Sequence, residues 1–200
     1  VTFKDARAPV DQMFSPNFQL KFAREFLDEF QDRIVAMIRG NHDEMPDKKI
    51  GIDIHGQLVE GRPFPYMPHG GLMDLLVGES QDTAVSYRVA WKHHYGNSSQ
   101  INPFNRFRRL EEWALHTADI HVLEHLHSPS LAVKYLGGHE SVIKKILEIN
   151  NGAFKQSDGY SLEYFRKGIE TCATVALCAK EKKFQGFVGP DAMQDALRYV

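Results

Sequence analysis

The clearest pattern of hydrophobic and polar positions lies near the start of the chain, between residues 15 and 30. An aromatic side chain recurs at every fourth position, with charged residues between, at Phe18, Phe22, Phe26 and Phe30. This spacing places the four rings on one face of a helix. Ser15 offers a capping hydroxyl, and Pro16 suits the first helical position. We predict an amphipathic helix whose Phe face packs in the core against a sheet.

Shorter apolar runs predict the strands of that sheet. Residues 34–38 are almost wholly apolar, which is typical of a central strand buried on both faces. Residues 85–91 alternate between apolar and polar side chains, as a half-buried strand does. The pattern over residues 119–123 predicts another short strand. Because helices alternate with these strands, we predict a mixed α/β fold in which the three strands are neighbours and their C-terminal ends converge.

Other segments carry weaker patterns. Residues 44–71 are rich in Gly, Pro and Met, and we expect a long loop there with one short strand over 50–54. Further elements are a helix over 102–116, an antiparallel pair of strands over 131–135 and 142–149, a strand over 174–179 and a last helix over 192–199.

Composition limits the class of protein. The chain has 200 residues, 42% of them hydrophobic, and a formal net charge of -2. We expect one soluble domain over residues 1–200 that is neither a general nucleic-acid binder nor a membrane protein. Two cysteines and no visible signal peptide indicate a reducing, cytoplasmic compartment. The chain begins with Val1 rather than Met, so we expect it to be N-terminally incomplete.

Three polar clusters follow predicted strands. They are Gly40-Asn41-His42-Asp43 after the first strand, His93-His94 after the second, and His125-Leu126-His127 after the third. Taken singly, the first could be a polar turn and each histidine pair a solvated loop. Taken together, they place amide and imidazole groups at one edge of a sheet, where ligands bind in α/β folds. A His-x-His pair can contact one ion or two neighbouring ions.

In these blocks the chain resembles the calcineurin-like metallophosphoesterases. That family carries a GNH(D/E) block, then a lone His after a strand, then a GHxH block. The resemblance covers about residues 8–155, and the surrounding sequence, including 92–98 and 151–154, is similar to a subgroup found in phages and bacteria. It implies a layered α/β/β/α sandwich of two mixed sheets. It also implies a metal-dependent phosphoesterase that hydrolyses a phosphomonoester or phosphodiester, such as a small phosphoester, a nucleotide or a nucleic-acid end.

The same resemblance implies the roles of the site residues. One metal ion would be held by Asn41, His93 and His125, and a neighbouring ion by His127. A hydroxide bridging two such ions would attack phosphorus in line. The catalytic residues would be His42, which protonates the leaving oxygen or steadies the charged transition state, and Asp43, which orients it. Ligands of this mix suit Mn, Zn or Fe.

The sequence departs from the family pattern in three places. The initial Asp-x-His block is absent. In the GDxxD block the bridging Asp falls on Ala8, although Asp11 matches the second acid. The Gly of the GHxH block is Glu124 here. We therefore expect one tight metal site and a second, doubtful one. The alternative function is a degenerate, inactive phosphoesterase fold that acts as a binding or structural protein.

Other polar residues have two open interpretations. Arg106, Arg108 and Arg109 could meet a substrate phosphate or form a solvated helix face. His55 and His69 could line the substrate cleft or lie in a solvated loop.

Overall fold

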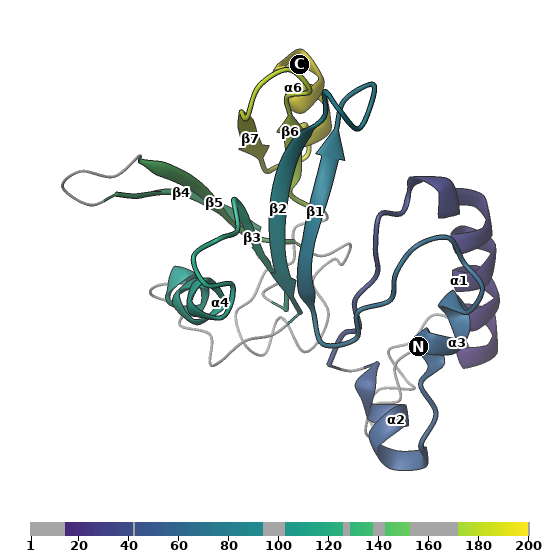
Figure 1. Ribbon diagram of the computed structural model, residues 1–200. Coiled ribbons are helices and arrows are strands. Elements are labelled where there is room, and N and C mark those ends of the chain that lie inside the picture. Colours follow the sequence, from purple (N-terminus) through teal and green to yellow (C-terminus); the bar gives the residue numbers. More distant parts are fainter. Residues whose placement is uncertain are drawn as a thin grey trace. The chain divides into compact units, whose positions relative to one another are not determined.

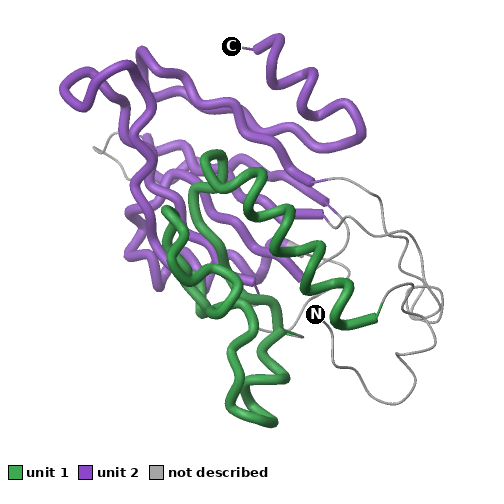
Figure 2. Tube along the Cα trace, turned by 90° about the vertical axis from the view of Figure 1, so that its right-hand side faces the viewer, with its two compact units in different colours: residues 1–70 green, residues 71–200 purple. Residues whose placement is uncertain are grey.

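The computed structural model describes residues 15–41, 43–93, 103–125, 129–137, 143–152 and 172–199. They belong to two compact units, residues 1–70 and 71–200, which are coloured separately in Figure 2. The expectation of a single domain over 1–200 stays a prediction. Among the described residues, no helix is both long enough and apolar enough to cross a membrane.

The first unit is built from helices. They are α1 (Pro16–Phe30), the short 3-10 helix η1 (Gln31–Arg33), α2 (Glu44–Ile50) and α3 (Ile54–Val59). The predicted cap of α1 is confirmed, because the Ser15 hydroxyl oxygen accepts a hydrogen bond from the Phe18 amide at 3.3 Å. The core of this unit combines Leu27 of α1 with Leu58 and Val59 of α3 and with Phe64.

The predicted burial of the Phe face of α1 is wrong. Phe18, Phe22 and Phe26 are 48%, 61% and 49% exposed. The buried face carries smaller side chains instead: Leu20, Ala23 and Leu27, which pack against α3. The rings pack partly on one another along the helix surface, with Phe26 and Phe30 centroids 4.8 Å apart. Aliphatic residues at helical spacing therefore set the buried face, although the aromatic pattern is more conspicuous in the sequence.

Two predicted strands of the first unit are also wrong. Residues 34–38 make only an isolated bridge, between Met37 and Tyr66. The region expected to be a loop with a strand over 50–54 instead contains α2 and α3. Pro46 is tolerated because it lies in the first turn of α2, where its missing amide has no helical partner. Gly51 ends α2 with a φ of 69°, a conformation that favours glycine.

The second unit contains a five-stranded sheet of order β1-β2-β3-β5-β4 (Figure 1). Its strands are β1 (Gly71–Val77), β2 (Val85–Lys92), β3 (Ile120–Leu123), β4 (Ser130–Leu136) and β5 (Lys144–Asn150). The central strands β2, β3 and β5 are parallel, and each outer strand is antiparallel to its neighbour. Register pairs Val89 with Ile120 and Lys92 with Leu123. The expected pairing of the strands near 85–91 and 119–123 is confirmed.

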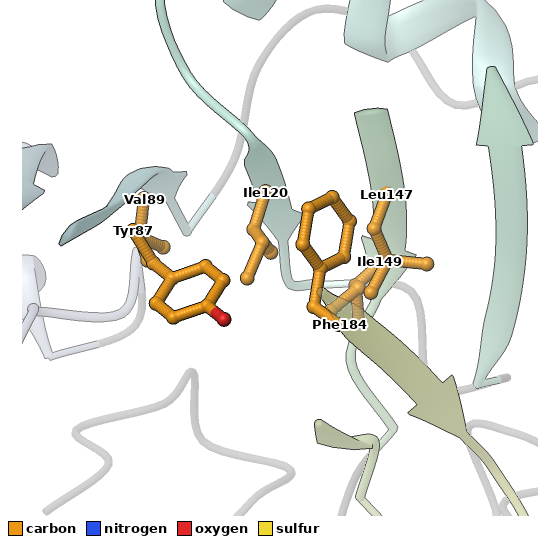
Figure 3. Packing of buried hydrophobic residues seen from close by; sticks show 6 residues of the cluster. All are labelled: Tyr87, Val89, Ile120, Leu147, Ile149 and Phe184. Atoms are coloured by element: carbon orange, nitrogen blue, oxygen red, sulfur yellow. The ribbon is translucent and has the colours of Figure 1, made fainter. Parts of the chain in front are cut away.

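A two-stranded antiparallel sheet covers one face of this sheet. It consists of β6 (Thr174–Leu177) and β7 (Phe184–Phe187), and α6 (Ala192–Tyr199) packs against it. Figure 3 shows the apolar cluster between the two sheets, formed by Tyr87, Val89, Ile120, Leu147, Ile149 and Phe184. The Tyr87 hydroxyl lies 2.6 Å from the carbonyl oxygen of Cys178 and ties the sheet to the segment between β6 and β7.

A helix covers the opposite face of the five-stranded sheet. The 3-10 helix η2 (Pro103–Arg106) leads into α4 (Phe107–Trp113), which packs against β2 and β3. Its buried Phe107 and Leu110 meet Ala90 and Leu123, which point away from the β6–β7 layer. The second unit is therefore layered as α4, five-stranded sheet, two-stranded sheet and α6. The predicted α/β/β/α arrangement of two sheets is confirmed.

Candidate metal centre

The C-terminal ends of β2 and β3 place polar side chains next to one another. His93 directly follows β2, and Glu124 and His125 directly follow β3. Because Lys92 and Leu123 are register partners in parallel strands, the residues after them leave the sheet side by side. The Glu124 amide also donates to the Lys92 carbonyl oxygen at 3.3 Å. The pairing of two strands thus determines which residues meet at this edge.

The side chains at this edge contact one another directly. The Nδ1 atom of His93 lies 3.1 Å from a carboxylate oxygen of Glu124. The rings of His93 and His125 meet edge to face, with centroids 5.5 Å apart and planes at 81°. The side chains of His93 and Glu124 are 22% and 33% exposed, so the group is partly covered but reachable from solvent. His93 therefore contacts the side chains of both Glu124 and His125.

A buried arginine stabilises the turn that carries Glu124 and His125. Arg106 of η2 is buried, and its guanidinium donates a hydrogen bond to the Glu124 carbonyl oxygen at 3.1 Å. Burial lowers the pKa of the Arg106 guanidinium from its ordinary value, but the side chain stays a cation at neutral pH. His125 has a φ of 72°, in the left-handed region. That conformation costs a non-glycine residue roughly 1 kcal/mol, and such residues cluster at functional sites.

The end of the third parallel strand, β5, lies next to this turn. The Asn151 amide donates to the Leu123 carbonyl oxygen at 2.9 Å. Asn150 is fully buried, and its side-chain amide donates to the Ser130 hydroxyl at 2.9 Å. The first bond fixes the end of β3 from the side opposite to β2, and the second ties the end of β5 to the start of β4.

The Gly40–Asp43 turn belongs to the first unit and has its own contacts. Buried Arg39 precedes it and pairs with Asp47 of α2 at 2.8 Å and with Asp53 at 3.4 Å. A carboxylate oxygen of Asp43 lies 3.6 Å from Nε2 of His55. Burial lowers the pKa of His55, which favours the neutral imidazole. The turn is thus anchored to α2. It also lies next to His55, which the sequence allowed either in the substrate cleft or in a solvated loop.

The predicted site residues fall into three groups. His93 and His125 are brought together by the second unit. Asn41 and Asp43 lie in the turn of the first unit. His42 and His127 lie outside the described residues, as do Ala8 and Asp11. The full ligand set, and the pairing of Asp43 with His42, stay predictions.

The described residues provide part of a metal-binding set. Within residues 15–41, 43–93, 103–125, 129–137, 143–152 and 172–199, no group of three or more His, Cys, Asp or Glu side chains could hold an ion. The pair His93 and His125 supplies two nitrogen ligands of the type that Mn, Zn and Fe accept, because imidazole suits all three. This edge therefore supplies two of the four metal ligands expected from the sequence.

The contacts of two residues here were not predicted from the sequence. In the sequence Glu124 is a departure from the glycine of the family pattern, whereas in the structure its carboxylate is a direct partner of His93. The sequence allows Arg106 to meet a substrate phosphate, but its side chain is buried and bonds the Glu124 carbonyl oxygen. Arg108, by contrast, lies on an exposed helix face and pairs with Glu112 at 3.1 Å. The one signal in the sequence was the position of Glu124, which places a carboxylate directly before the predicted ligand His125.

No protein-family model matches the chain, and no curated protein matches it. Among solved structures, it is similar to a Thermotoga maritima protein determined by NMR, with 16% identity and a TM-score of 0.41 over 81% of this chain and 85% of that one.

Two further solved structures show a similar degree of likeness. One is a conserved uncharacterized protein from Streptococcus pneumoniae, described as a predicted phosphoesterase, with 16% identity and a TM-score of 0.38 over 85% of this chain and 91% of that one. The other is a double mutant of Vps29 from Entamoeba histolytica, with 14% identity and a TM-score of 0.38 over 82% and 83%. Function is therefore inferred from the residues of this chain.

Proposed function

We propose that this chain is a metal-dependent phosphoesterase that hydrolyses a phosphomonoester or phosphodiester. The observation that carries the proposal is the convergence of His93 and His125 at the C-terminal ends of two parallel strands, with ring centroids 5.5 Å apart. The family pattern in the sequence independently implies metal binding at these two positions. Two histidines 32 positions apart are close only because β2 and β3 pair, so their meeting is specific support.

The proposed metal ligands are Asn41, His93, His125 and His127, with Mn, Zn or Fe as the ion. When bound, such an ion polarises a phosphoryl oxygen and lowers the pKa of a coordinated water. The residues of the chain would orient that ion through neutral imidazole nitrogens and the Asn41 amide oxygen. The left-handed backbone of His125 and the Arg106 bond to Glu124 support a preformed turn for this purpose.

The proposed catalytic residues are His42 and Asp43. His42 would donate a proton to the leaving oxygen of the substrate or steady the charge that develops on the phosphoryl group. Asp43 would hold the ring of His42 in position. Its carboxylate also lies 3.6 Å from His55 Nε2, so His55 is available to restrain the carboxylate on its other side. The substrate class is a small phosphoester, a nucleotide or a nucleic-acid end.

A second candidate function is a binding or structural role without hydrolysis. Ala8 at the position of the bridging Asp favours it, because an alanine cannot join two ions. Metal binding by itself does not separate the two functions, but hydrolysis does. A chain with this binding or structural role would keep both its fold and its role when His42 is replaced.

The test measures bound metal and hydrolysis on the same samples. After loading with Mn²⁺ or Zn²⁺ and dialysis, we expect one ion per chain, loss of that ion in His93→Ala, and retention in His116→Ala, which removes a histidine outside the proposed ligand set. With bis(p-nitrophenyl) phosphate, His42→Ala should lower the rate on the order of 10²–10⁴-fold while metal content is unchanged. Retention of the ion by His93→Ala would contradict the proposed site, and an active His42→Ala would contradict the catalytic role.

A further inference from the structure

Glu124 stands where the family pattern has a glycine, and the structure gives its side chain a specific contact. A carboxylate oxygen of Glu124 lies 3.1 Å from Nδ1 of His93. A glycine at this position could make no such contact. The replacement therefore adds a charged partner for a proposed metal ligand.

A neutral imidazole has one protonated nitrogen and one nitrogen with a free lone pair. A carboxylate accepts hydrogen bonds but donates none, so the nitrogen that faces Glu124 is the one that carries the proton. The Nε2 atom of His93 is then the nitrogen left to act as a ligand. Histidines that bind metals commonly donate their other nitrogen to a carboxylate, which fixes the tautomer and the orientation of the ring.

Glu124 is itself held by its backbone. Its carbonyl oxygen accepts from buried Arg106 at 3.1 Å, and its amide donates to Lys92 at 3.3 Å. The side chain therefore starts from a backbone fixed to both η2 and β2. His93 follows Lys92 directly, so one strand pairing sets the positions of both partners. The contact is thus a built feature of the strand ends and is more than the chance meeting of two surface side chains.

We propose that Glu124 is a positioning residue that holds the His93 ring in the Nδ1-protonated tautomer and presents Nε2 to a divalent metal ion. The metal part of this inference rests on the proposed function, whereas the tautomer part does not. Glu124 acts through His93 and does not coordinate the ion. The residue that departs from the family pattern thereby strengthens one ligand of the site.

The first experiment uses the metal-free full chain labelled with ¹⁵N. Long-range ¹H–¹⁵N spectra at about pH 8 report which nitrogen of His93 carries the proton. We expect the Nδ1-protonated form in the wild type and in Glu124→Gln, whose amide oxygen can still accept. Glu124→Ala should move His93 toward the Nε2-protonated form that an unrestrained imidazole prefers in water. An unchanged tautomer in Glu124→Ala overturns the inference whatever the chain's activity.

The second experiment measures affinity for Mn²⁺ and Zn²⁺ by titration calorimetry. Glu124→Ala should bind about 10–100-fold more weakly than the wild type, as expected when the partner of a ligating histidine is lost. Glu124→Gln should lose less affinity than Glu124→Ala, because its amide oxygen can still accept a hydrogen bond from His93. The matched control is Glu112→Ala, which removes an exposed carboxylate paired with Arg108 and should bind as the wild type does.

The outcomes separate the inference from the proposed function. If the wild type binds neither ion, the proposed function fails, and the tautomer of His93 in Glu124→Ala alone decides whether Glu124 positions the ring. If Glu124→Gln keeps the tautomer but loses as much affinity as Glu124→Ala, Glu124 is a direct ligand and the positioning role is wrong. Equal affinity in the wild type and Glu124→Ala also overturns the positioning role.

Discussion

Leu147 and Glu148 are consecutive residues of β5, and both are buried, but they face opposite layers of the second unit. Leu147 is 2% exposed and lies in the apolar cluster beneath β7 (Figure 3). Glu148 is 7% exposed and shares the opposite face with the side chain of His121, its register partner on β3. One strand therefore contributes an apolar side chain to the cluster on one side and a buried ionisable group on the other.

The apolar face is closely packed. A Cβ atom added to Gly186 of β7 would lie 3.0 Å from Leu131 and 3.1 Å from Leu147. Only glycine fits there without a shift of its neighbours. This interface contributes to stability through burial and contact, which do not depend on pH in the neutral range.

The face covered by α4 contains ionisable groups at low exposure. Glu111 of α4 pairs with Lys134 of β4 at 2.6 Å and with His116 at 3.3 Å. His121 is fully buried, and neither of its ring nitrogens has a hydrogen-bond partner among the described residues. Burial lowers the pKa of His121 to about 4. Burial also raises the pKa of Glu148 to about 7, with Lys134 opposing and Glu111 adding to the rise.

These shifts give the two faces different pH dependence. The folded pKa of His121 lies below its ordinary 6.5, so the unfolded state binds more protons and stability falls as the pH drops from about 6.5 to about 4. The folded pKa of Glu148 lies above its ordinary 4.5, so the folded state binds more protons. The stabilisation that Glu148 contributes is fully present below a pH of about 4.5 and is lost as the pH rises through about 7.

The largest expected effect comes from the apolar face. Leu147→Ala should lower the free energy of unfolding by about 2–5 kcal/mol, because it removes a buried side chain and leaves a cavity under β7. Urea denaturation at about pH 5 and at about pH 8 should give the same loss. A loss that differs strongly between the two pH values would show that this face is coupled to the ionisable groups opposite it.

A smaller, pH-dependent effect is expected on the other face. Glu148→Gln should raise the free energy of unfolding by about 1–3 kcal/mol at about pH 8, where the wild type buries a charge, and should change it little at about pH 5. The contribution of His121 is present in both proteins and cancels in the difference. The measurement is urea denaturation of both proteins across this range. An equal effect at both pH values would mean that Glu148 does not titrate as its burial indicates.

Sequence patterns predicted the second unit better than the first. Residues 85–91 alternate strictly and became β2, and the expected pair over 131–135 and 142–149 became β4 and β5. These strands are long enough for their period to be visible. In the first unit, the apolar run at 34–38 gave only the bridge at Met37, because local hydrophobicity does not state whether a partner strand exists. The helix over 54–59 lacks a visible period because it is only six residues long.

The candidate site was predicted by residue type more than by contact. The sequence pattern selected His93 and His125, and the strand pairing that brings them together was also expected. The hydrogen bond that Glu124 accepts from His93 could not be derived, because it depends on the register of β2 against β3 and on the backbone turn at His125. The burial of Arg106 was equally hidden, since its neighbours Arg108 and Arg109 lie on the exposed side of the helix.

The parallel pairing of β2 and β3 also has a consequence for the order of folding. The antiparallel pairs β1–β2 and β4–β5 join strands that are close in the sequence, whereas His93 and Glu124 are 31 residues apart and meet only when β2 and β3 pair. Long-range parallel pairing closes more chain and forms more slowly. In pulsed hydrogen exchange during refolding, we expect amides of the β1–β2 hairpin to gain protection before the Asp119 amide, which bonds Arg88 across β2 and β3 at 2.8 Å. Simultaneous protection would refute this order; if it holds, the proposed metal ligands come together only in the later steps of folding.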